Sequence, residues 1–241
     1  REIMSGSSGI VDIINFNIAS GCSGGVCVIT LSSTLVANPG LGLLYITNEG
    51  STQRIEISGN NSVRVFQVNS GANLTINSLT IRNGISGPGF GGGILNQGSL
   101  TIINSTIKNN SPDGDGGGIY NDAGAVLSVN NSTISNNSAG SDGGGIYNGG
   151  TVTIINSTIS NNSVTGSTSG GTGGGGIFNV GIVTIINSTI SNNSSIFGGG
   201  GIRNLSGTVN ARNTIIANNS ASFTGPDFSG TLNSQGYNLI R

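Results

Sequence analysis

The 241-residue chain has no histidine and little charge, with eight Lys and Arg residues, nine Asp and Glu residues and a net charge of −1. A nearly neutral chain has no electrostatic reason to bind nucleic acid or an anionic membrane. No apolar run reaches the ~18 residues that a transmembrane segment requires, and no amphipathic helix pattern of useful length occurs. We expect neither nucleic-acid partners nor a membrane span, and no cofactor.

Cysteine is also scarce. The chain has only Cys22 and Cys27, and the four residues between them, two of which are glycine, suffice to close a small disulfide loop. Two free thiols are an alternative, and a metal site would need carboxylates as further ligands. We favour the disulfide, because thiols pair in oxidising compartments, and we expect a secreted or cell-surface protein. The chain begins at Arg1 without a start Met or signal peptide, which suggests a mature part of a longer precursor.

Glycine is abundant, at 44 residues, and Asn, Ser and Thr fill much of the rest. Such a composition is typical of disordered linkers. However, Ile, Val and Leu recur at fixed positions, and disordered tracts have no such registered apolar columns. We therefore expect an ordered chain despite this composition.

The order is a repeat: Leu/Val-Thr-Ile-Ile-Asn-Ser-Thr-Ile-Ser-Asn-Asn-Ser, a Gly-rich stretch, then Gly-Gly-Gly-Ile-Tyr/Phe-Asn. Its copies are spaced by 26, 27, 25, 31 and 26 residues and start at Leu74, Leu100, Leu127, Val152, Val183 and Val209. This period indicates a solenoid, in which each unit buries its apolar face only against its neighbours. We predict an all-β fold, a right-handed single-stranded parallel β-helix with 25–27 residues per coil, the hand following the preference of parallel crossover connections.

We expect one domain over residues 1–241, with less regular coils at 1–73, regular repeats at 74–231 and a degenerate last turn at 232–241. Strands are expected in the first part at Ile10–Ile18, Val26–Leu31, Leu43–Thr47, Arg54–Ser58 and Val63–Val68.

Aligned repeats place aliphatic residues in four stacked columns, represented by Leu100, Ile102, Ile107 and Ile94. Leu100 and Ile102 share one strand face, whereas Ile107 lies an odd number of residues further on, so the chain has to bend between them. Asparagine tolerates the left-handed backbone of such a bend, and stacked amides can bond to one another. The predicted asparagine ladders are Asn104, Asn131, Asn156, Asn187 and Asn213, and Asn109, Asn136, Asn161, Asn192 and Asn218, the second column beginning at Asn83.

These motifs resemble a known family. The Gly-Gly-Gly-Ile…Asn repeats are similar to those of polymorphic outer-membrane adhesin-like proteins. Ile57–Phe66, Leu79–Gly84 and Gly236–Ile240 resemble CSLREAI-type bacterial extracellular proteins, of whose motif Arg1-Glu2-Ile3 would be the remnant. The resemblance covers nearly the full length and implies a secreted or surface-anchored β-helix, with little implied about activity.

Some of the acidic residues are candidates for catalysis or metal binding. Asp115 and Asp142 fall in one column, one coil apart, a spacing compatible in principle with a pair of glycosidase carboxylates. With Asp113 they could also form a weak calcium site. They lie in a Gly-rich corner without a cluster of bases, so we favour solvated loop acids and predict that the protein is not an enzyme.

Two further polar patterns have simpler explanations. Asn-x-Ser/Thr sequons occur at Asn104, Asn130, Asn131, Asn156 and Asn187, but ladder packing would prevent glycosylation, which needs an exposed loop. Threonine rows, one at Thr101, Thr153 and Thr184 and one at Thr80, Thr106, Thr133, Thr158 and Thr189, suggest ice binding. The neighbouring column is broken, so β-propensity explains them better.

The strongest candidate binding site is an aromatic ladder. If the Ile of each Gly-Gly-Gly-Ile points inward, alternation directs Tyr120, Tyr147 and Phe178 outward on three successive coils, with Arg203 next. Exposed aromatic rings can bind sugars or a partner surface. The alternative is that the rings stack on each other and stiffen the face.

Two functions follow. The first is a non-catalytic extracellular structural protein, adhesin-like or forming a filament or sheath, which associates end to end because solenoid ends expose unpaired strands. The second is a carbohydrate-binding or polysaccharide-active β-helix, with glycans or cell-surface polymers as partners. Ice binding is a distant third.

Overall fold

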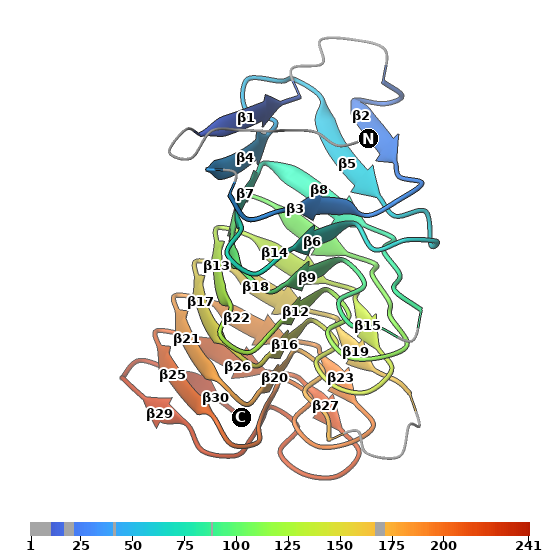
Figure 1. The fold of residues 1–241 in the computed structure, drawn as a ribbon. Coiled ribbons are helices and arrows are strands. Elements are labelled where there is room, and N and C mark those ends of the chain that lie inside the picture. Colours follow the sequence, from blue (N-terminus) through green and yellow to red (C-terminus); the bar gives the residue numbers. More distant parts are fainter. Residues whose placement is uncertain (1–10, 17–21, 41, 88, 167–171) are drawn as a thin grey trace.

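The computed structural model describes residues 11–16, 22–40, 42–87, 89–166 and 172–241 (Figure 1). It is an all-β solenoid of about eight turns, built from parallel sheets that run along its length. The described residues include no helix, and so none able to cross a membrane. The expected motif remnant Arg1-Glu2-Ile3 lies outside the described residues.

Sheet A contains the first strand of each coil. Leu100 pairs with Leu74 on one side and Leu127 on the other, so the predicted repeat register is confirmed. Its nine parallel strands are β1 (Asp12–Asn15), β4 (Leu43–Thr47), β7 (Asn73–Asn77), β10 (Ser99–Ile103), β13 (Val126–Asn130), β17 (Thr151–Ile155), β21 (Ile182–Ile186), β25 (Thr208–Arg212) and β29 (Asn233–Ser234).

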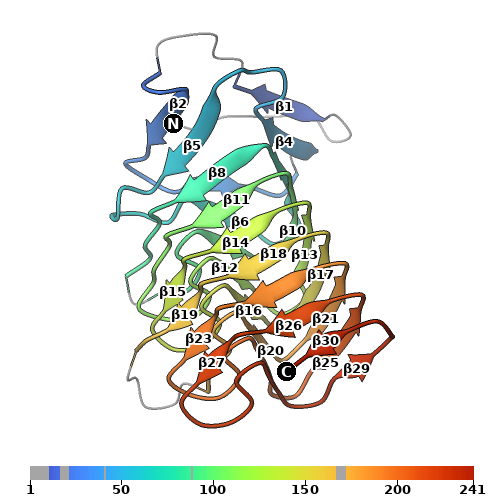
Figure 2. The same ribbon diagram turned by 180° about the vertical axis from the view of Figure 1, so that it is seen from behind.

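Sheet B forms the face seen in Figure 2, and in the coils that contain β10 to β25 it follows sheet A after a corner of two residues. Its nine strands are β2 (Val26–Thr30), β5 (Arg54–Ser58), β8 (Leu79–Arg82), β11 (Thr106–Lys108), β14 (Thr133–Ser135), β18 (Thr158–Ser160), β22 (Thr189–Ser191), β26 (Ile215–Ala217) and β30 (Leu239–Ile240).

Sheet C closes each coil. Its strands are β3 (Leu35–Ala37), β6 (Phe66–Val68), β9 (Ile94–Asn96), β12 (Ile119–Asn121), β16 (Ile146–Asn148), β20 (Ile177–Asn179), β24 (Ile202–Asn204) and β28 (Phe228–Ser229). A fourth sheet, D, was not predicted, because its two-residue strands have no aliphatic pattern. They are β15 (Ser138–Ala139), β19 (Ser163–Val164), β23 (Ser194–Ser195) and β27 (Ser220–Ala221).

The N-terminal coils follow the prediction in part. Strands at Leu43–Thr47 and Arg54–Ser58 have the predicted bounds, whereas β1 and β6 are shorter than predicted and β3 was missed. Residues 10, 17 and 18 of the first predicted strand lie outside the described part. Coil length varies here, since Leu44 pairs with Leu74, 30 residues on, whereas Ile55 pairs with Leu79, 24 residues on.

The core consists of the predicted aliphatic columns. Ile107, Ile134 and Ile159 are stacked in register and at most 1% exposed. The equivalent columns of sheets A and C are buried as completely. Each residue of a column packs only against the coils directly above and below it. Apolar burial therefore stabilises the rod through contacts between neighbouring coils.

The glycine triplets let the backbone of each coil approach sheet D and a buried asparagine. In Gly143-Gly144-Gly145 the first residue has φ of 67°. A Cβ on Gly144 would lie 2.4 Å from the carbonyl oxygen of Ser163, and one on Gly145 would lie 3.1 Å from the Asn162 side chain. The second and third glycines are therefore required by space.

Candidate functional site

The aromatic ladder of sheet C exists as a stack. Tyr120, Tyr147 and Phe178 are the central residues of β12, β16 and β20 and are aligned in register. The ring centroids of the two tyrosines are 4.5 Å apart with an interplanar angle of 7°, and those of Tyr147 and Phe178 are 5.2 Å apart. Phe90, which sequence reasoning did not include, lies 4.8 Å from Tyr120 and extends the stack. Because a Gly-rich loop separates Phe90 from the sheet C strand of its coil, the repeat alignment does not place Phe90 in the ladder, and only the fold shows that it belongs there.

Stacking decides what the ladder can offer to a ligand. Phe178 lies in the outward row as expected, but its expected exposure is wrong, because it is only 3% exposed; the tyrosines are partly buried and Phe90 is 45% exposed. The rings cover each other's faces, so a sugar could lie flat only on the outer face of Phe90. The tyrosines contribute their edges and hydroxyl groups.

Arg203 follows Phe178 in register, as expected. Its guanidinium donates to the Ser229 hydroxyl of the next coil, and its Nε is buried without a hydrogen-bond partner. Arg203 therefore ends the ladder, and its guanidinium is held by the hydroxyl of Ser229.

The tyrosine hydroxyls lie in an acidic environment. Burial raises the pKa of Tyr120, and the neighbouring Tyr147 and Asp122 raise it further. Burial also raises the pKa of Tyr147, with contributions from Asp115 and Asp142. Both hydroxyls therefore remain protonated and can donate hydrogen bonds at neutral pH.

Asp115 and Asp142 hold the backbone of adjacent coils. The carboxylate of Asp115 accepts a hydrogen bond from the backbone N–H of Asp142 at 3.0 Å. Oδ1 of Asp142, a residue only 9% exposed, accepts bonds from the backbone N–H groups of Thr172 and Gly173 at 2.6 and 2.7 Å. The expectation of solvated loop acids is thus wrong for Asp142, because its carboxylate replaces a backbone acceptor between coils.

Burial raises the pKa of both carboxyls, and for Asp115 the charge of Asp142 raises it further. Asp113, the third member of the candidate calcium site, is exposed. In the described part of the chain, no three His, Cys, Asp or Glu residues come close enough to bind a metal ion. The fold therefore does not gather Asp113, Asp115 and Asp142 into a calcium site.

Asparagine has two structural roles, which the sequence did not separate. Every residue of the two predicted columns has positive φ, from 48° at Asn131 to 63° at Asn218, so the predicted left-handed corners are confirmed. The first column makes some ladder bonds, such as Asn213 Nδ2 to Asn187 Oδ1 at 2.8 Å. Within the described residues, no side-chain hydrogen bond joins Asn109, Asn136, Asn161, Asn192 and Asn218 to one another, so this predicted ladder is wrong.

The continuous ladders lie elsewhere. One is displaced by a single residue, with side-chain bonds of 2.9 Å linking Asn110, Asn137, Asn162, Asn193 and Asn219. The other links the last residues of the sheet C strands at 2.7–2.9 Å: Asn96, Asn121, Asn148, Asn179 and Asn204. Their constancy at every repeat was a signal that sequence reasoning passed over.

The corner asparagines are mostly exposed. Asn104, Asn131, Asn156 and Asn187 are exposed although some of them make ladder bonds, so burial does not separate these sequons from solvent; that they lack a glycan stays a prediction. Asn130 is partly buried at the end of β13.

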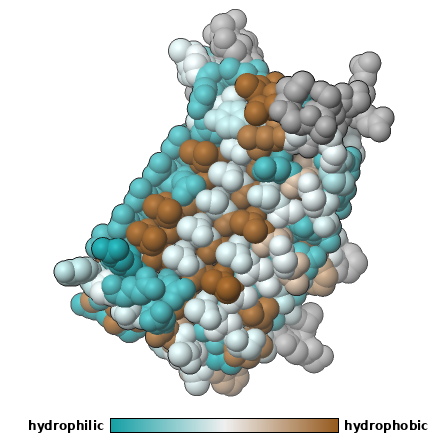
Figure 3. All heavy atoms as spheres, turned by 60° about the vertical axis from the view of Figure 1, so that its left-hand side comes forward, coloured by the Kyte–Doolittle hydropathy of each residue, from teal (hydrophilic) through white to brown (hydrophobic). Residues whose placement is uncertain are grey.

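Hydroxyl groups line the outer faces of two sheets. Thr101, Ser128, Thr153 and Thr184 form the central row of sheet A, as predicted, and Thr75 extends it by one coil. The row is flanked by exposed aliphatic residues such as Val126 and Ile182. Figure 3 shows separate brown patches of hydrophobic residues on this side of the rod. On sheet B, Thr133, Thr158 and Thr189 are aligned, each with a serine two residues further on.

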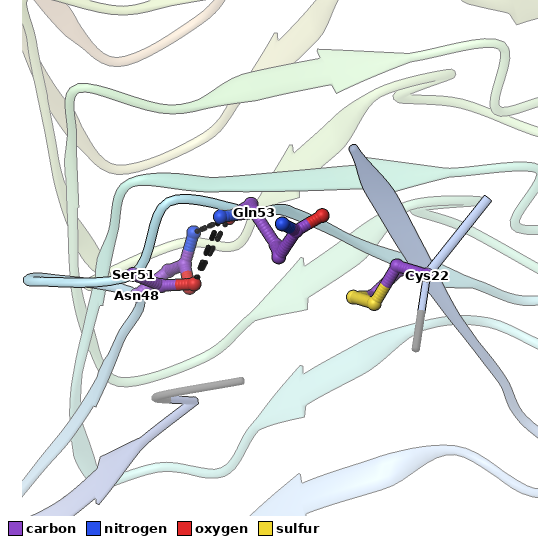
Figure 4. The surroundings of a disulfide bond; sticks show 5 residues. Cys22, Asn48, Ser51 and Gln53 are labelled. Atoms are coloured by element: carbon purple, nitrogen blue, oxygen red, sulfur yellow. Dashed lines mark hydrogen bonds between the residues drawn. A yellow bond between two sulfur atoms is a disulfide. The ribbon is translucent and has the colours of Figure 1, made fainter. Parts of the chain in front are cut away.

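Cys22 and Cys27 form the predicted disulfide, with Cα atoms 4.8 Å apart (Figure 4). A tight turn brings them together, in which the Val26 N–H donates to the Ser23 carbonyl at 3.1 Å and both Gly24 and Gly25 have positive φ. Cys27 is 7% exposed and belongs to the core. The disulfide thus closes the turn that leads into β2.

Among the described residues, one open depression of about 470 Å³ lies at the C-terminal end between the corner of Asn187 and Asn213 and the segment Tyr237–Leu239, away from these groups. Comparisons of the chain with protein-family models, curated protein sequences and solved structures find no match. Function therefore has to be argued from the residues themselves.

Proposed function

We propose that this chain is a non-catalytic structural protein of the cell exterior, an adhesin-like or filament-forming rod. The observation that carries the proposal is the use of its polar side chains. Buried asparagines, serines and carboxylates bond to an adjacent coil, as the side chains of Asn162, Ser157 and Asp142 do. Side chains bonded in this way stabilise a long, stiff rod, and few polar groups are left free for catalysis. The disulfide and the resemblance of the repeats to those of surface proteins support an extracellular location.

End-to-end association is part of this proposal. Within the described residues, β1, β2 and β3 lie at one end of their sheets and β28, β29 and β30 at the other. Unpaired strand edges favour addition of another chain. The C-terminal edge strands have only two residues each, but exposed Phe223 and Tyr237 near them add apolar surface.

Sedimentation velocity and electron microscopy of the purified chain test this assembly. We expect rods whose length increases with protein concentration. A combined Phe223→Ser and Tyr237→Ser variant should shorten them, whereas Val126→Ser, on the side of the rod, should not. A strict monomer at high concentration would exclude end-to-end assembly.

Carbohydrate binding is the second candidate, supported by the tyrosine hydroxyls beside Asp115, Asp122 and Asp142. A combined Tyr120→Phe and Tyr147→Phe variant keeps the ring stack and removes only the hydroxyls. If the ladder binds sugars by these edges, retention on a glycan array should be lost. An unmodified chain that no glycan retains would exclude this function.

A further inference from the structure

The outer face of sheet B contains the largest concentration of positive charge among the described residues. Arg54 and Glu56 lie on β5, Arg82 on β8 and Lys108 on β11, so the cluster covers three successive coils (Figure 2). The sheet B strands contain no other charged residue. Three cations and one carboxylate leave a net charge of about +2 at this place, on a chain whose total is −1.

Glu56 cannot neutralise its partners. Its side chain is 8% exposed, and its oxygens lie 2.5 Å from Arg82 Nε, 3.4 Å from Lys108 Nζ and 3.6 Å from Arg54 Nη2. All three cations therefore share one carboxylate. Arg54 is 65% exposed, and the side chains of Arg82 and Lys108 also reach solvent. The excess positive charge is available to a ligand.

The strand register makes this excess costly without a ligand. Lys108 is the direct cross-strand partner of Arg82 on the adjacent strand. Like charges directly opposite each other destabilise a sheet. The equivalent position in the next three coils is a serine: Ser135, Ser160 and Ser191. Glu56 offsets part of this repulsion, and a second anion held by Arg82 and Lys108 from the solvent side would relieve the rest.

The surroundings indicate what kind of anion fits. Next to the cations, the same face continues as paired hydroxyls at Thr133 and Ser135, then Thr158 and Ser160, without charge. Hydroxyls suit sugar hydroxyls as hydrogen-bond donors and acceptors. Nucleic acid fits poorly, because its binding commonly rests on about 6–10 phosphate contacts and on stacking with aromatic residues, and the sheet B strands contain no aromatic residue.

We infer that Arg54, Arg82 and Lys108 form a binding site for an acidic polysaccharide, with a carboxylate or sulfate group between Arg82 and Lys108. The neighbouring sugars lie along the threonine and serine rows of sheet B. This inference goes beyond the proposed structural role and holds whether or not the rods associate.

Affinity electrophoresis in gels containing polygalacturonate, heparin or neutral dextran tests the site. We expect the chain to be retarded by a polyanion and not by dextran, and salt to abolish the retardation. Polygalacturonate and heparin distinguish carboxylate from sulfate as the recognised group. Equal mobility in all three gels would overturn the inference.

Four variants separate the site from net charge and from folding. Lys108→Gln and Arg54→Gln should each weaken binding about tenfold, the equivalent of one charge-assisted hydrogen bond. Arg212→Gln, which changes net charge equally at the last residue of β25 in sheet A, should have no effect.

Glu56→Gln should strengthen binding, because it raises the local positive charge. Weaker binding by a Glu56→Gln variant whose melting curve shows it folded would overturn the inference. Equal losses in Lys108→Gln and Arg212→Gln would also overturn it.

Discussion

At the scale of single residues, asparagine shows how one residue type has two roles at adjacent positions. Asn161 is exposed with φ of 56°, and its neighbour Asn162 is fully buried. The first turns the chain; the second bonds to the coils on both sides.

We predict that Asn162→Ala lowers the free energy of unfolding by about 2–3 kcal/mol, because the buried N–H groups of Asn137 lose their acceptor. Asn161→Gly is the matched control. Glycine adopts a left-handed backbone without strain, so its effect should stay within about 0.5 kcal/mol. Urea denaturation measures both, and equal effects would contradict the separation of roles.

The buried acids predict a pH dependence. The pKa of Asp142 is raised in the folded state by burial. Above the unfolded pKa of about 4, the folded chain therefore binds more protons than the unfolded chain. The stability that comes from protonated Asp142 is present below that pH and is lost as pH rises through the raised pKa.

Asp142→Asn keeps an oxygen acceptor for Thr172 and Gly173 but does not titrate. We expect its free energy of unfolding, relative to the unmodified chain, to increase between about pH 3 and about pH 7. Asp113→Asn, at an exposed position, should show no such trend. Denaturation at several pH values measures the difference; a flat difference for Asp142→Asn would contradict the role of burial.

At the scale of strands, stability comes from stacked aliphatic columns. Ile134 lies between Ile107 and Ile159, and its side chain has no exposed surface. Ile134→Ala should cost about 2–5 kcal/mol through lost burial and the resulting cavity.

Val126, on the adjacent sheet, provides the control, because it is 49% exposed. Val126→Thr should change stability by less than about 0.5 kcal/mol. Thermal or chemical denaturation of both variants tests whether inward and outward positions alternate as the strand period requires. Similar losses in both would contradict that alternation.

At the scale of the whole molecule, the solenoid is quasi-one-dimensional, since each coil contacts only its neighbours. The disulfide acts at one end of this series, where Cys27 on β2 packs against the core. Its stabilising effect should therefore be local.

We predict that Cys22→Ser combined with Cys27→Ser destabilises the first coils by about 2 kcal/mol, the loop-closure entropy of so short a loop. Hydrogen exchange should become faster in β2 and β5 and remain unchanged in β14 and β18. Uniformly faster exchange along the rod would show instead that the coils unfold as one unit.

Much of this fold could be predicted because a repeat aligns residues without coordinates. The period determines that Leu100 lies over Leu127, and strand alternation determines that Tyr120 points outward. Ile107 points inward because the chain bends at Asn104 between the two strands. The left-handed corners follow in the same way, because asparagine tolerates that backbone. Those conclusions need only the spacing of residues along one chain.

The tertiary structure alone decided which side chains meet across coils and what remains exposed. Phe90 and Tyr120 stack although they do not occupy equivalent positions of the repeat, because Phe90 precedes the Gly-rich loop of its coil. Phe178 is buried although its strand position is outward. Arg54, Arg82 and Lys108 share Glu56 because the coils place them diagonally across three strands. The physical reason is that a repeat specifies which residues occupy equivalent positions, whereas side-chain contacts depend on the direction and reach of each side chain in three dimensions.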